Sequence, residues 1–211
     1  MSADRLLLAT RNTRKLAELR RILALSDLGG VQVIGLDEVP PFPEAPETGA
    51  TFEDNALAKA LDAAAATGLA TVADDSGLEV DALNGMPGVF SARWAGRHGD
   101  DVANLQLVLD QLTDVPDDRR GAAFICAAAL VVPGVNQTVV RARWGGTLTR
   151  APRGSNGFGY DPIFIPAGGR RTSAELDPAE KDAVSHRGQA LRALLPALRT
   201  LVSDRSGPPQ P

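Results

Sequence analysis

Residues 51–77 read TFEDNALAKALDAAAATGLATVADDSG, and this stretch indicates the fold class. Its first part predicts a helix that runs to about Thr67, because Thr51 and the acids after it form a capping box and Gly68 supplies a stop. Residues 70–73 then predict a buried strand, with Asp74-Asp-Ser-Gly77 at its C-terminal end. Helices that alternate with buried strands are typical of α/β proteins.

The chain before this stretch repeats the alternation. Arg5–Ala9 predicts a first buried strand, and a helix follows Asn12, with one apolar face formed by Leu16, Leu19, Ile22 and Leu23. Val31–Gly35 predicts a second strand. The segment Asp37–Gly49 holds four prolines and four acids, so we interpret it as a loop.

The chain after this stretch adds a hairpin and more helices. A turn is expected at Gly85–Gly88, and a helix at Asp101–Leu112, with its apolar face formed by Val102, Leu105, Leu109 and Leu112. Residues 122–132 and 138–144 predict two strands around Pro133-Gly134. Asp177-Pro178 starts a short helix, and Ser185 caps the last one, whose core-facing residues are Leu191, Leu194, Leu195, Leu198 and Leu201. The pattern predicts an α/β chain with a mixed sheet.

Composition narrows the function classes. With 211 residues and 44% hydrophobic content, the chain can build one substantial core, or one core with a smaller lobe. The formal net charge is 22 − 26 = −4, which argues against a protein that binds a nucleic-acid backbone. The single Cys126 cannot form an internal disulfide, which fits a reducing cytoplasm. Residues 1–8 carry no signal-peptide pattern, and no apolar run is long enough to span a bilayer. We therefore expect a cytoplasmic protein without a membrane or nucleic-acid partner.

A first candidate site is Thr10-x-Asn12-x-x-Lys15, at a junction between strand and helix. A helix N-terminus offers free N–H groups and partial positive charge, which suit phosphate, and Lys15 adds a full charge. The segment is not a P-loop, because the glycine-rich pattern is absent. Read alone, Asn12 is equally a plain N-cap before a surface helix.

A second group of candidates is acidic. Asp74 and Asp75 suit Mg²⁺, which takes one or two carboxylates together with substrate phosphates, although they also fit a simple turn. Because strand side chains alternate, we expect only one of the two aspartates to enter a given cleft. Glu47 could share the metal. Asn55 and Lys59 lie four residues apart on one helical face, which is either a solvated face or part of the site.

Two further segments could recognise a base. Gly154-Ser-Asn-Gly-Phe-Gly-Tyr-Asp161 combines glycines, which allow close approach to a ligand, with the apolar rings of Phe158 and Tyr160; it is also compatible with an ordinary glycine-rich loop. Ser185-His186-Arg187 supplies donors that could bond to the oxygen edge of a base, although a surface histidine is the simpler interpretation.

Taken together, five segments resemble the inosine/xanthosine triphosphate pyrophosphatase family over about residues 6–200. They are TRNTRK at 10–15, ETGATF at 47–52, ADDSGL at 73–78, GSNGFGYDP at 154–162 and SHRG at 185–188. The resemblance implies a two-lobed ITPase-like α/β fold with a long central mixed sheet flanked by helices, and an active cleft between the lobes. It also implies a homodimer. We expect residues 1–204 to form one such domain and residues 205–211 to be a flexible tail.

The resemblance also implies roles for individual residues. The triphosphate would be cradled by Thr10, Arg11, Asn12, Thr13, Arg14 and Lys15, with Arg11 standing where the family pattern often has glycine. Glu47 and Asp75 would hold Mg²⁺, and Asp75 would be the general base. Lys15 and Lys59 would supply positive charge. Further substrate contacts would come from Asn55, Ser76, Phe158, Gly159, Tyr160, Asp161, Lys181, His186 and Arg187.

The implied activity is Mg²⁺-dependent hydrolysis of ITP, dITP and XTP to the monophosphate and pyrophosphate. Water attacks the α-phosphorus, so that catalysis is mainly positioning and charge stabilisation. Two alternatives stay open: a nucleotide sensor without turnover, and a pyrophosphatase for modified pyrimidine nucleotides. Also open are the ranking of the substrates, the exclusion of GTP, whether Asp75 acts as base or mainly as ligand, and the roles of Arg93 and Trp94.

Overall fold

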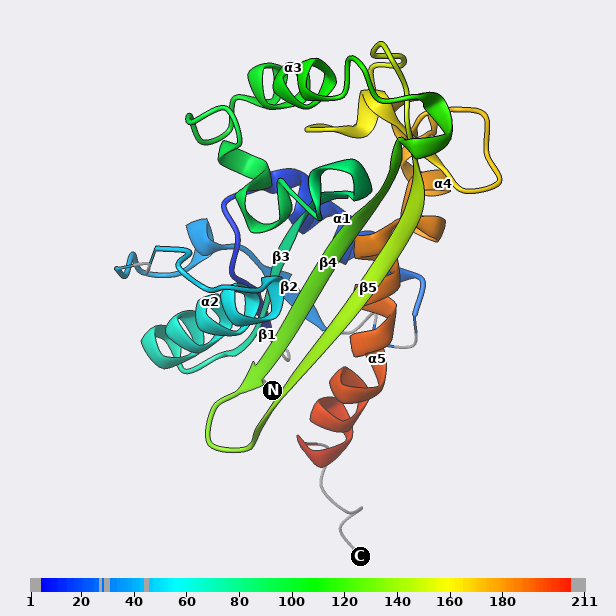
Figure 1. Ribbon diagram of the computed structural model, residues 1–211. Helices are drawn as coiled ribbons and strands as arrows, with labels where there is room; N and C mark the ends of the chain where they lie inside the picture. The colour runs from blue at the N-terminus through cyan, green and yellow to red at the C-terminus, as the bar shows by residue number, and fades with distance from the viewer. Residues whose placement is uncertain (1–4, 27, 29–30, 44–45, 206–211) are drawn as a thin grey trace, which may run out of the picture. The chain divides into compact units, whose positions relative to one another are not determined.

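The computed structural model describes residues 5–26, 28, 31–43 and 46–205, and in this part of the chain helices and strands follow one another as an α/β protein requires (Figure 1). The strands are β1 (Arg5–Leu8), β2 (Gln32–Ile34), β3 (Ala70–Val80), β4 (Gly121–Val132), β5 (Asn136–Leu148) and β6 (Phe164–Pro166). The α-helices are α1 (Thr13–Ala24), α2 (Phe52–Thr67), α3 (Asp101–Gln111), α4 (Pro178–Val184) and α5 (His186–Arg205).

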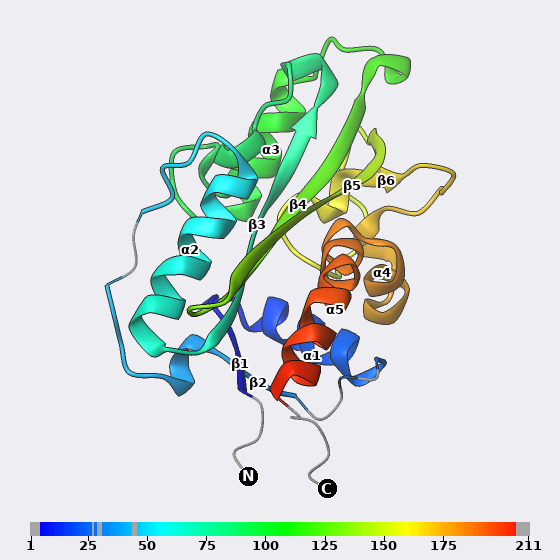
Figure 2. The same ribbon diagram turned by 90° about the horizontal axis from the view of Figure 1, so that it is seen from below.

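The six strands form one sheet in the order β2-β1-β3-β4-β5-β6. Strand β1 pairs in parallel with β2 and with β3, whereas β5 pairs with β6 in the antiparallel sense. The predicted hairpin is confirmed, since β4 and β5 are neighbours joined by the turn at Pro133-Gly134 (Figures 1 and 2). The predicted mixed sheet is confirmed as well.

The chain divides into two compact units. Unit 1 comprises residues 1–75, 127–141 and 188–211, and unit 2 comprises residues 76–126 and 142–187. Whether residues 1–204 act as one domain stays a prediction.

Unit 1 has a layered core. Helix α2 lies on one face of its strands, and α1 and α5 lie on the other (Figure 2). Leu7 of β1, Ile34 of β2 and Ala63 of α2 pack together with almost no exposed surface. Alanine predominates in α2, and its small side chains bring the helix close to the strands. The capping box at Thr51 and the left-handed Gly68 (φ 68°) bound α2 as the sequence predicts.

Unit 2 has a second core, built around α3. Leu105, Val108, Leu109 and Leu112 pack against residues of β3, β4 and β5. The prediction that Val102 belongs to this apolar face is wrong, because Val102 is 79% exposed and Val108 is fully buried in its place. Positions 105, 108, 109 and 112 follow the helical repeat and form the buried face of α3. In the first turn the buried side chain is that of Asn104, and Val102 lies outside this face.

Strand β3 also differs from the sequence prediction. Asp74-Asp75 lies in the middle of a strand of 11 residues and not at its end. The strand continues because Leu78 and Val80 are fully buried in the core of unit 2. Gly77 permits this, since a side chain there would collide with the hydroxyl oxygen of Ser91, which accepts a hydrogen bond from the Leu78 amide. Asp74–Gly77, whose residue types are typical of turns, therefore lie within a strand, and Gly77 stands where the segment that contains Ser91 approaches closely.

The C-terminal part agrees with the sequence prediction in outline. Helix α4 begins at Pro178 with Asp177 as its cap, and Leu191, Leu194 and Leu198 of α5 are buried. Leu195 is only partly buried, and the side chain of Leu201 lies outside the described residues, as do residues 206–211 of the predicted tail.

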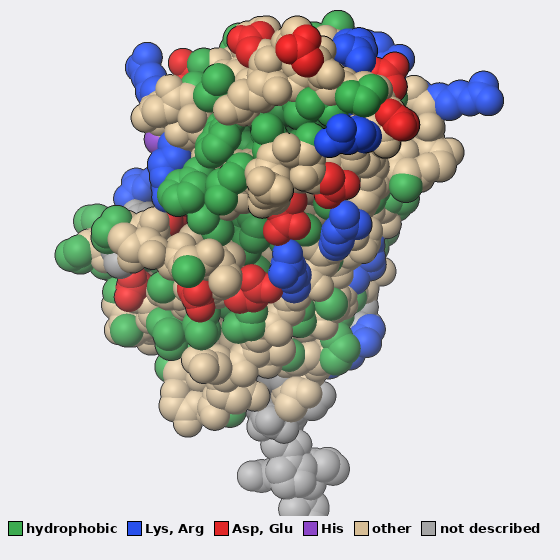
Figure 3. Space-filling model, in the orientation of Figure 1, with side chains coloured by type: hydrophobic (Ala, Val, Ile, Leu, Met, Phe, Trp, Pro, Cys, Tyr) green, Lys and Arg blue, Asp and Glu red, His purple; other side chains and the backbone are tan. Residues whose placement is uncertain are grey.

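On the face drawn in Figure 3, the acidic and basic side chains are interspersed and form no continuous basic surface among the described residues.

Candidate functional site

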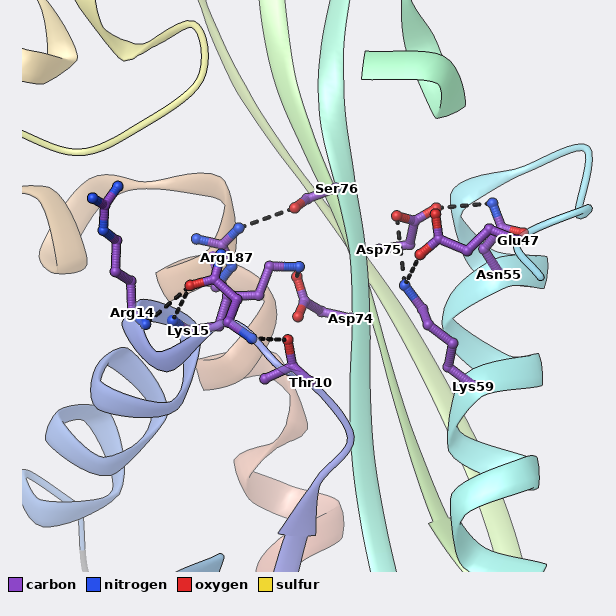
Figure 4. Close-up of polar contacts among 11 residues, drawn as sticks. Thr10, Arg14, Lys15, Glu47, Asn55, Lys59, Asp74, Asp75, Ser76 and Arg187 are labelled. Atoms are coloured by element: carbon purple, nitrogen blue, oxygen red, sulfur yellow. Dashed lines mark hydrogen bonds and ion pairs between the residues drawn. The ribbon is translucent and has the colours of Figure 1, made fainter. Parts of the chain in front are cut away.

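Strand β3 directs its two aspartates to opposite sides. Asp74 points toward Lys15 at the start of α1, and Asp75 points toward α2 (Figure 4). Lys15 Nζ lies 2.8 Å from Asp74 Oδ2, and both side chains are largely buried. The prediction that the two aspartates face different surroundings is therefore confirmed, and its cause is the alternation of side chains along a strand.

Asp75 is held by two side chains of α2. The Asn55 amide donates to Asp75 Oδ2 at 2.9 Å, and Lys59 Nζ lies 3.7 Å from Asp75 Oδ1. Burial raises the pKa of Asp75, and the nearby Glu47 adds to this, whereas Lys59 and Asn55 oppose it. The carboxylate form of Asp75 is thus destabilised in unit 1, so a further positive charge beside it would be favourable.

A single ammonium bridges the two carboxylates that were predicted to hold a metal. Lys59 Nζ lies 2.7 Å from Glu47 Oε1 as well as within reach of Asp75 (Figure 4). Burial alone would lower the pKa of Lys59, but Asp75, Asp74 and Glu47 more than offset this, and the pKa is raised. When both carboxyls are ionised, this trio has a formal charge of 1 − 2 = −1.

Asn55 connects the acidic loop to the strand. It is 2% exposed, and its Oδ1 accepts the Gly49 amide at 2.7 Å while its amide donates to Asp75. Both ends of the side chain are therefore engaged within the protein. Its predicted contact with substrate stays a prediction; what the structure shows is that Asn55 fixes the Glu47 loop and Asp75 relative to each other.

The segment of residues 10–15 forms the entry to α1. Asn12 is the N-cap, and its Oδ1 accepts the amides of Arg14 and Lys15 at 3.0 and 3.4 Å. Thr10 Oγ1 accepts the Asn12 amide at 3.2 Å. The side chains of Arg11, Thr13 and Arg14 are exposed. Asn12 thus serves as the plain cap that the sequence allowed, and its side-chain amide is left to donate elsewhere.

Unit 2 contains a pocket of about 100 Å³. All eight substrate-contact residues predicted in this unit line it, namely Ser76, Phe158, Gly159, Tyr160, Asp161, Lys181, His186 and Arg187. Residues that the sequence analysis did not assign complete the lining, namely Gly77, Ser91, Ala92, Asp101, Asn104 and Phe124. The sequence thus identified more than half of the residues that line the pocket.

Aromatic rings and a cation form much of the pocket wall. The His186 ring stacks on Phe124, with centroids 4.8 Å apart and an interplanar angle of 10°. Arg187 Nη2 donates to Ser76 Oγ at 3.0 Å, and its guanidinium lies 5.5 Å from the centre of the Phe158 ring. His186 and Arg187 are 4% and 3% exposed, so they are buried groups and not the surface residues that the simpler interpretation suggested.

Asp161 organises the loop that carries Phe158. It is 1% exposed and accepts the Phe158 amide at 2.8 Å, the Ser173 hydroxyl at 2.6 Å and the Lys181 ammonium. A side chain at Gly157 would collide with the Asp161 carboxylate. Lys181 also lies 5.4 Å from the centre of the Phe158 ring. Asp161 therefore holds Lys181 and the loop in place, and its contact with substrate stays a prediction.

The two residues left open beside the pocket also have partners in unit 2. Trp94 Nε1 donates to Gln111 Oε1 at 2.9 Å, and its ring packs against the core of this unit. The Arg93 guanidinium lies 5.3 Å from the centre of the Phe90 ring.

Among the described helices, none is both long and apolar enough to cross a membrane.

The fold and these two groups of residues define a class: an α/β protein with a carboxylate–lysine cluster beside a helix N-terminus and a separate aromatic pocket lined by buried cations. Comparison with known proteins gives the family. Residues 6–197 match the model of the Ham1 family, and the chain belongs to this family.

Relatives and solved structures agree with this assignment. A protein of Nocardia farcinica named dITP/XTP pyrophosphatase is 67% identical over 206 residues, which are 98% of this chain and 100% of that relative. One of Mycobacterium tuberculosis with the same name is 65% identical, covering 94% and 97% of the two chains. The crystal structure of a nucleoside-triphosphatase / dITP/XTP pyrophosphatase from Mycobacterium abscessus is 63% identical, with a TM-score of 0.74 and coverage of 91% and 99%. A HAM1 protein from Coxiella burnetii is 44% identical, with a TM-score of 0.81 and coverage of 93% and 98%.

Proposed function

We propose that this protein hydrolyses ITP, dITP and XTP to the nucleoside monophosphate and pyrophosphate, and so removes deaminated purines from the nucleotide pool. One observation carries the proposal: Glu47 and Asp75 lie close enough to share a single cation, the Lys59 ammonium. Two carboxylates that share a cation suit a metal–polyphosphate complex. The names of the relatives point to the same substrates.

The donor set fits Mg²⁺. Among the described residues, no group of three or more His, Cys, Asp or Glu side chains is arranged to hold a metal by itself. Two carboxylates are nevertheless what Mg²⁺ commonly takes from a protein, because substrate phosphates and water complete its coordination. When bound, Mg²⁺ would neutralise phosphate charge and polarise the phosphoryl oxygens.

The chain's own residues supply the rest of the chemistry in unit 1. Lys15 and the N-terminal end of α1 attract phosphate oxygens. The raised pKa of Asp75 makes its carboxylate a better proton acceptor than an ordinary aspartate, which suits a group that orients and deprotonates the attacking water. Asn55 keeps one oxygen of Asp75 hydrogen-bonded, so that the carboxylate has a fixed direction.

The pocket of unit 2 suits a purine with an oxygen at position 6. Its aromatic walls offer faces for a planar base, and His186 and Arg187 are buried donors at the same pocket. A donor that bonds to a 6-oxo group meets another donor when adenine presents its amino group there. A mismatch of this kind in a buried site is rejected by roughly 10⁴-fold.

The proposed function also implies partners and a location for the protein. The substrate is a small purine nucleotide and not a nucleic acid, in keeping with the net charge of −4 and the interspersed surface charges of Figure 3. We also propose that the protein is a cytoplasmic homodimer. The sensor without turnover explains the pocket but not the carboxylate pair. The enzyme for modified pyrimidine nucleotides explains the carboxylate pair but does not fit the purine substrates in the names of the relatives.

The test is pyrophosphate release from ITP, XTP, ATP and GTP, each with Mg²⁺ and with a chelator. We expect fast, Mg²⁺-dependent release from ITP and XTP and little from ATP or GTP. Tight binding of ITP without release would favour the sensor. Equal rates with all four nucleotides would remove the proposed role of the pocket and leave the phosphate chemistry intact.

A further inference from the structure

The first turn of α3 touches both walls of the pocket in unit 2. Asp101 is the first residue of this helix and Asn104 lies three positions on, so the two side chains project from the same face. Both line the pocket, and neither belongs to the segments that carry the resemblance to the family. Their hydrogen bonds show what this turn does.

Asn104 holds one wall. It is 1% exposed, its Oδ1 accepts the Ala95 amide at 2.7 Å, and its amide donates to the Ala92 carbonyl at 3.2 Å. The segment 91–95 is therefore fixed to α3. Because Ser91 and Ala92 line the pocket, this wall moves only if α3 moves with it.

Asp101 holds a second part of the lining, the segment of Phe158 and Gly159. Its Oδ2 accepts the Gly159 amide at 2.9 Å, between residues 58 positions apart in the chain. Gly159 has a left-handed backbone (φ 59°), a conformation that glycine adopts readily and that other residues rarely adopt. Burial raises the pKa of Tyr160, and the nearby Asp101 charge adds to this.

The walls are joined a second time at Tyr160, whose hydroxyl donates to the Ser91 carbonyl at 2.8 Å. Among the described contacts that hold the loop of residues 158–161, the bonds from Ser173 and Lys181 to Asp161 are buried and the bond from the Phe158 amide to Asp161 is partly buried, whereas the bond to Asp101 is exposed. Asp101 is therefore the contact that can change without disturbing the core.

We propose that Asp101 is a positioning residue that sets the width of the base pocket, by holding the Phe158–Gly159 segment at a fixed distance from the wall that Asn104 fixes. A planar base fits only while both walls are held, so Asp101 contributes to base affinity without touching the base. This inference rests on the proposed function, since it assigns the pocket to the base of the substrate.

The test uses Asp101→Ala and Asp101→Asn in the full chain, with Asp110→Ala as the matched control. Asp110 is an exposed aspartate of the same helix whose side chain bonds only to Gln106 among the contacts described. We expect Asp101→Ala to raise KM for ITP about fivefold to tenfold and to leave kcat within about twofold, because an interaction made equally in the ground and transition states is lost. Asp101→Asn retains an acceptor and should recover most of the affinity. The control should match the wild type.

A second measurement separates this inference from the proposed function. Hydrogen exchange of the Gly159 amide should be faster in Asp101→Ala than in the wild type or the control, and the affinity for IMP, measured by calorimetry with a chelator present, should fall by a similar factor. If the wild type does not turn over ITP, the proposed function fails while amide exchange and IMP affinity still decide the role of Asp101. Unchanged exchange and KM in Asp101→Ala would overturn the inference, as would an equal loss in kcat and kcat/KM.

Discussion

The charged cluster of unit 1 and the pocket of unit 2 are built in different ways. In unit 1, Glu47, Asp75 and Lys59 compensate one another's charges, and burial raises the pKa of Asp75. In unit 2, Asp161, Ser173 and Tyr160 are fixed by hydrogen bonds around stacked rings. The comparison suggests that the cluster is adapted to gaining or exchanging a cation, whereas the pocket is adapted to keeping its shape. Substitutions in the two regions should therefore fail differently.

Removing the charge of Asp75 should have the largest effect. We expect Asp75→Asn to lower kcat for ITP by about 10³-fold, because the variant loses a metal ligand and a proton acceptor together. The folded state should not be weakened at neutral pH, because burial raises the pKa of Asp75 and its ionisation above the ordinary pKa therefore costs the folded state free energy. Steady-state kinetics and thermal melting test both statements, with Asp62→Asn on α2, the helix that carries Asn55 and Lys59, as control. A strong loss of Tm would show that Asp75 is needed for the fold.

Truncation of Arg187 tests the pocket. The guanidinium bonds to Ser76 and lies over Phe158, so Arg187→Ala should lower kcat/KM for ITP by about 10²-fold. We expect a smaller change for ATP, which lacks the oxygen at position 6, and little change in Tm. The ratio of the two kcat/KM values is the decisive quantity. Unchanged kinetics with ITP would remove Arg187 from base recognition.

Asn55 both orients the Asp75 carboxylate and stabilises the fold through its bond with the Gly49 amide. Asn55→Ala should lower kcat by about tenfold while KM changes little, because the direction of the Asp75 carboxylate is lost. It should also lower Tm, since the Gly49 amide loses its partner, a change that costs about 1–3 kcal/mol for a buried group. Kinetics and melting of one preparation check both effects. A rise in KM alone would instead support the predicted contact of Asn55 with substrate.

The smallest expected effect concerns pH. The pKa of Glu175 is lowered by the Thr172 amide, and that of Glu180 by Arg171. A carboxyl with a lowered folded-state pKa stabilises the fold above its ordinary pKa and loses that contribution as pH falls through the folded value. Tm should therefore fall between about pH 5 and pH 3, and slightly less steeply in Glu180→Gln. Parallel slopes for the two proteins would show that Glu180 contributes nothing measurable.

The sequence predicted most of the elements but not how far β3 extends. Asp, Ser and Gly at residues 74–77 are typical of turns, and only the pairing of distant segments makes them a strand. The close approach of Ser91 to Gly77 is a tertiary contact that no local pattern records. Val102 was misplaced for a similar reason, since periodicity gives the spacing of a helical face but not the residue where burial begins.

The candidate site shows the same division. The family resemblance named eight residues that line one pocket, and all of them except Lys181 lie in the motif segments. Asp101 and Asn104 were missed, since in sequence they are ordinary polar residues of a helix's first turn. The available signal was a polar residue, Asn104, directly beside the apolar face of a predicted helix. The reason for this position is seen only in its hydrogen bonds to Ala92 and Ala95.

The strand pairing of unit 1 also has a consequence for the order of folding. The β4–β5 turn closes over residues 133–135, whereas the parallel register of β1 with β3 joins Leu6 to Ala70, 70 − 6 = 64 positions away. The larger loop costs about 3 kcal/mol more in closure entropy, so the hairpin is expected to form in microseconds and β1 to dock later. Because β1 leads directly into residues 10–15, the segment proposed to bind the triphosphate is expected to reach its place only after the hairpin has formed.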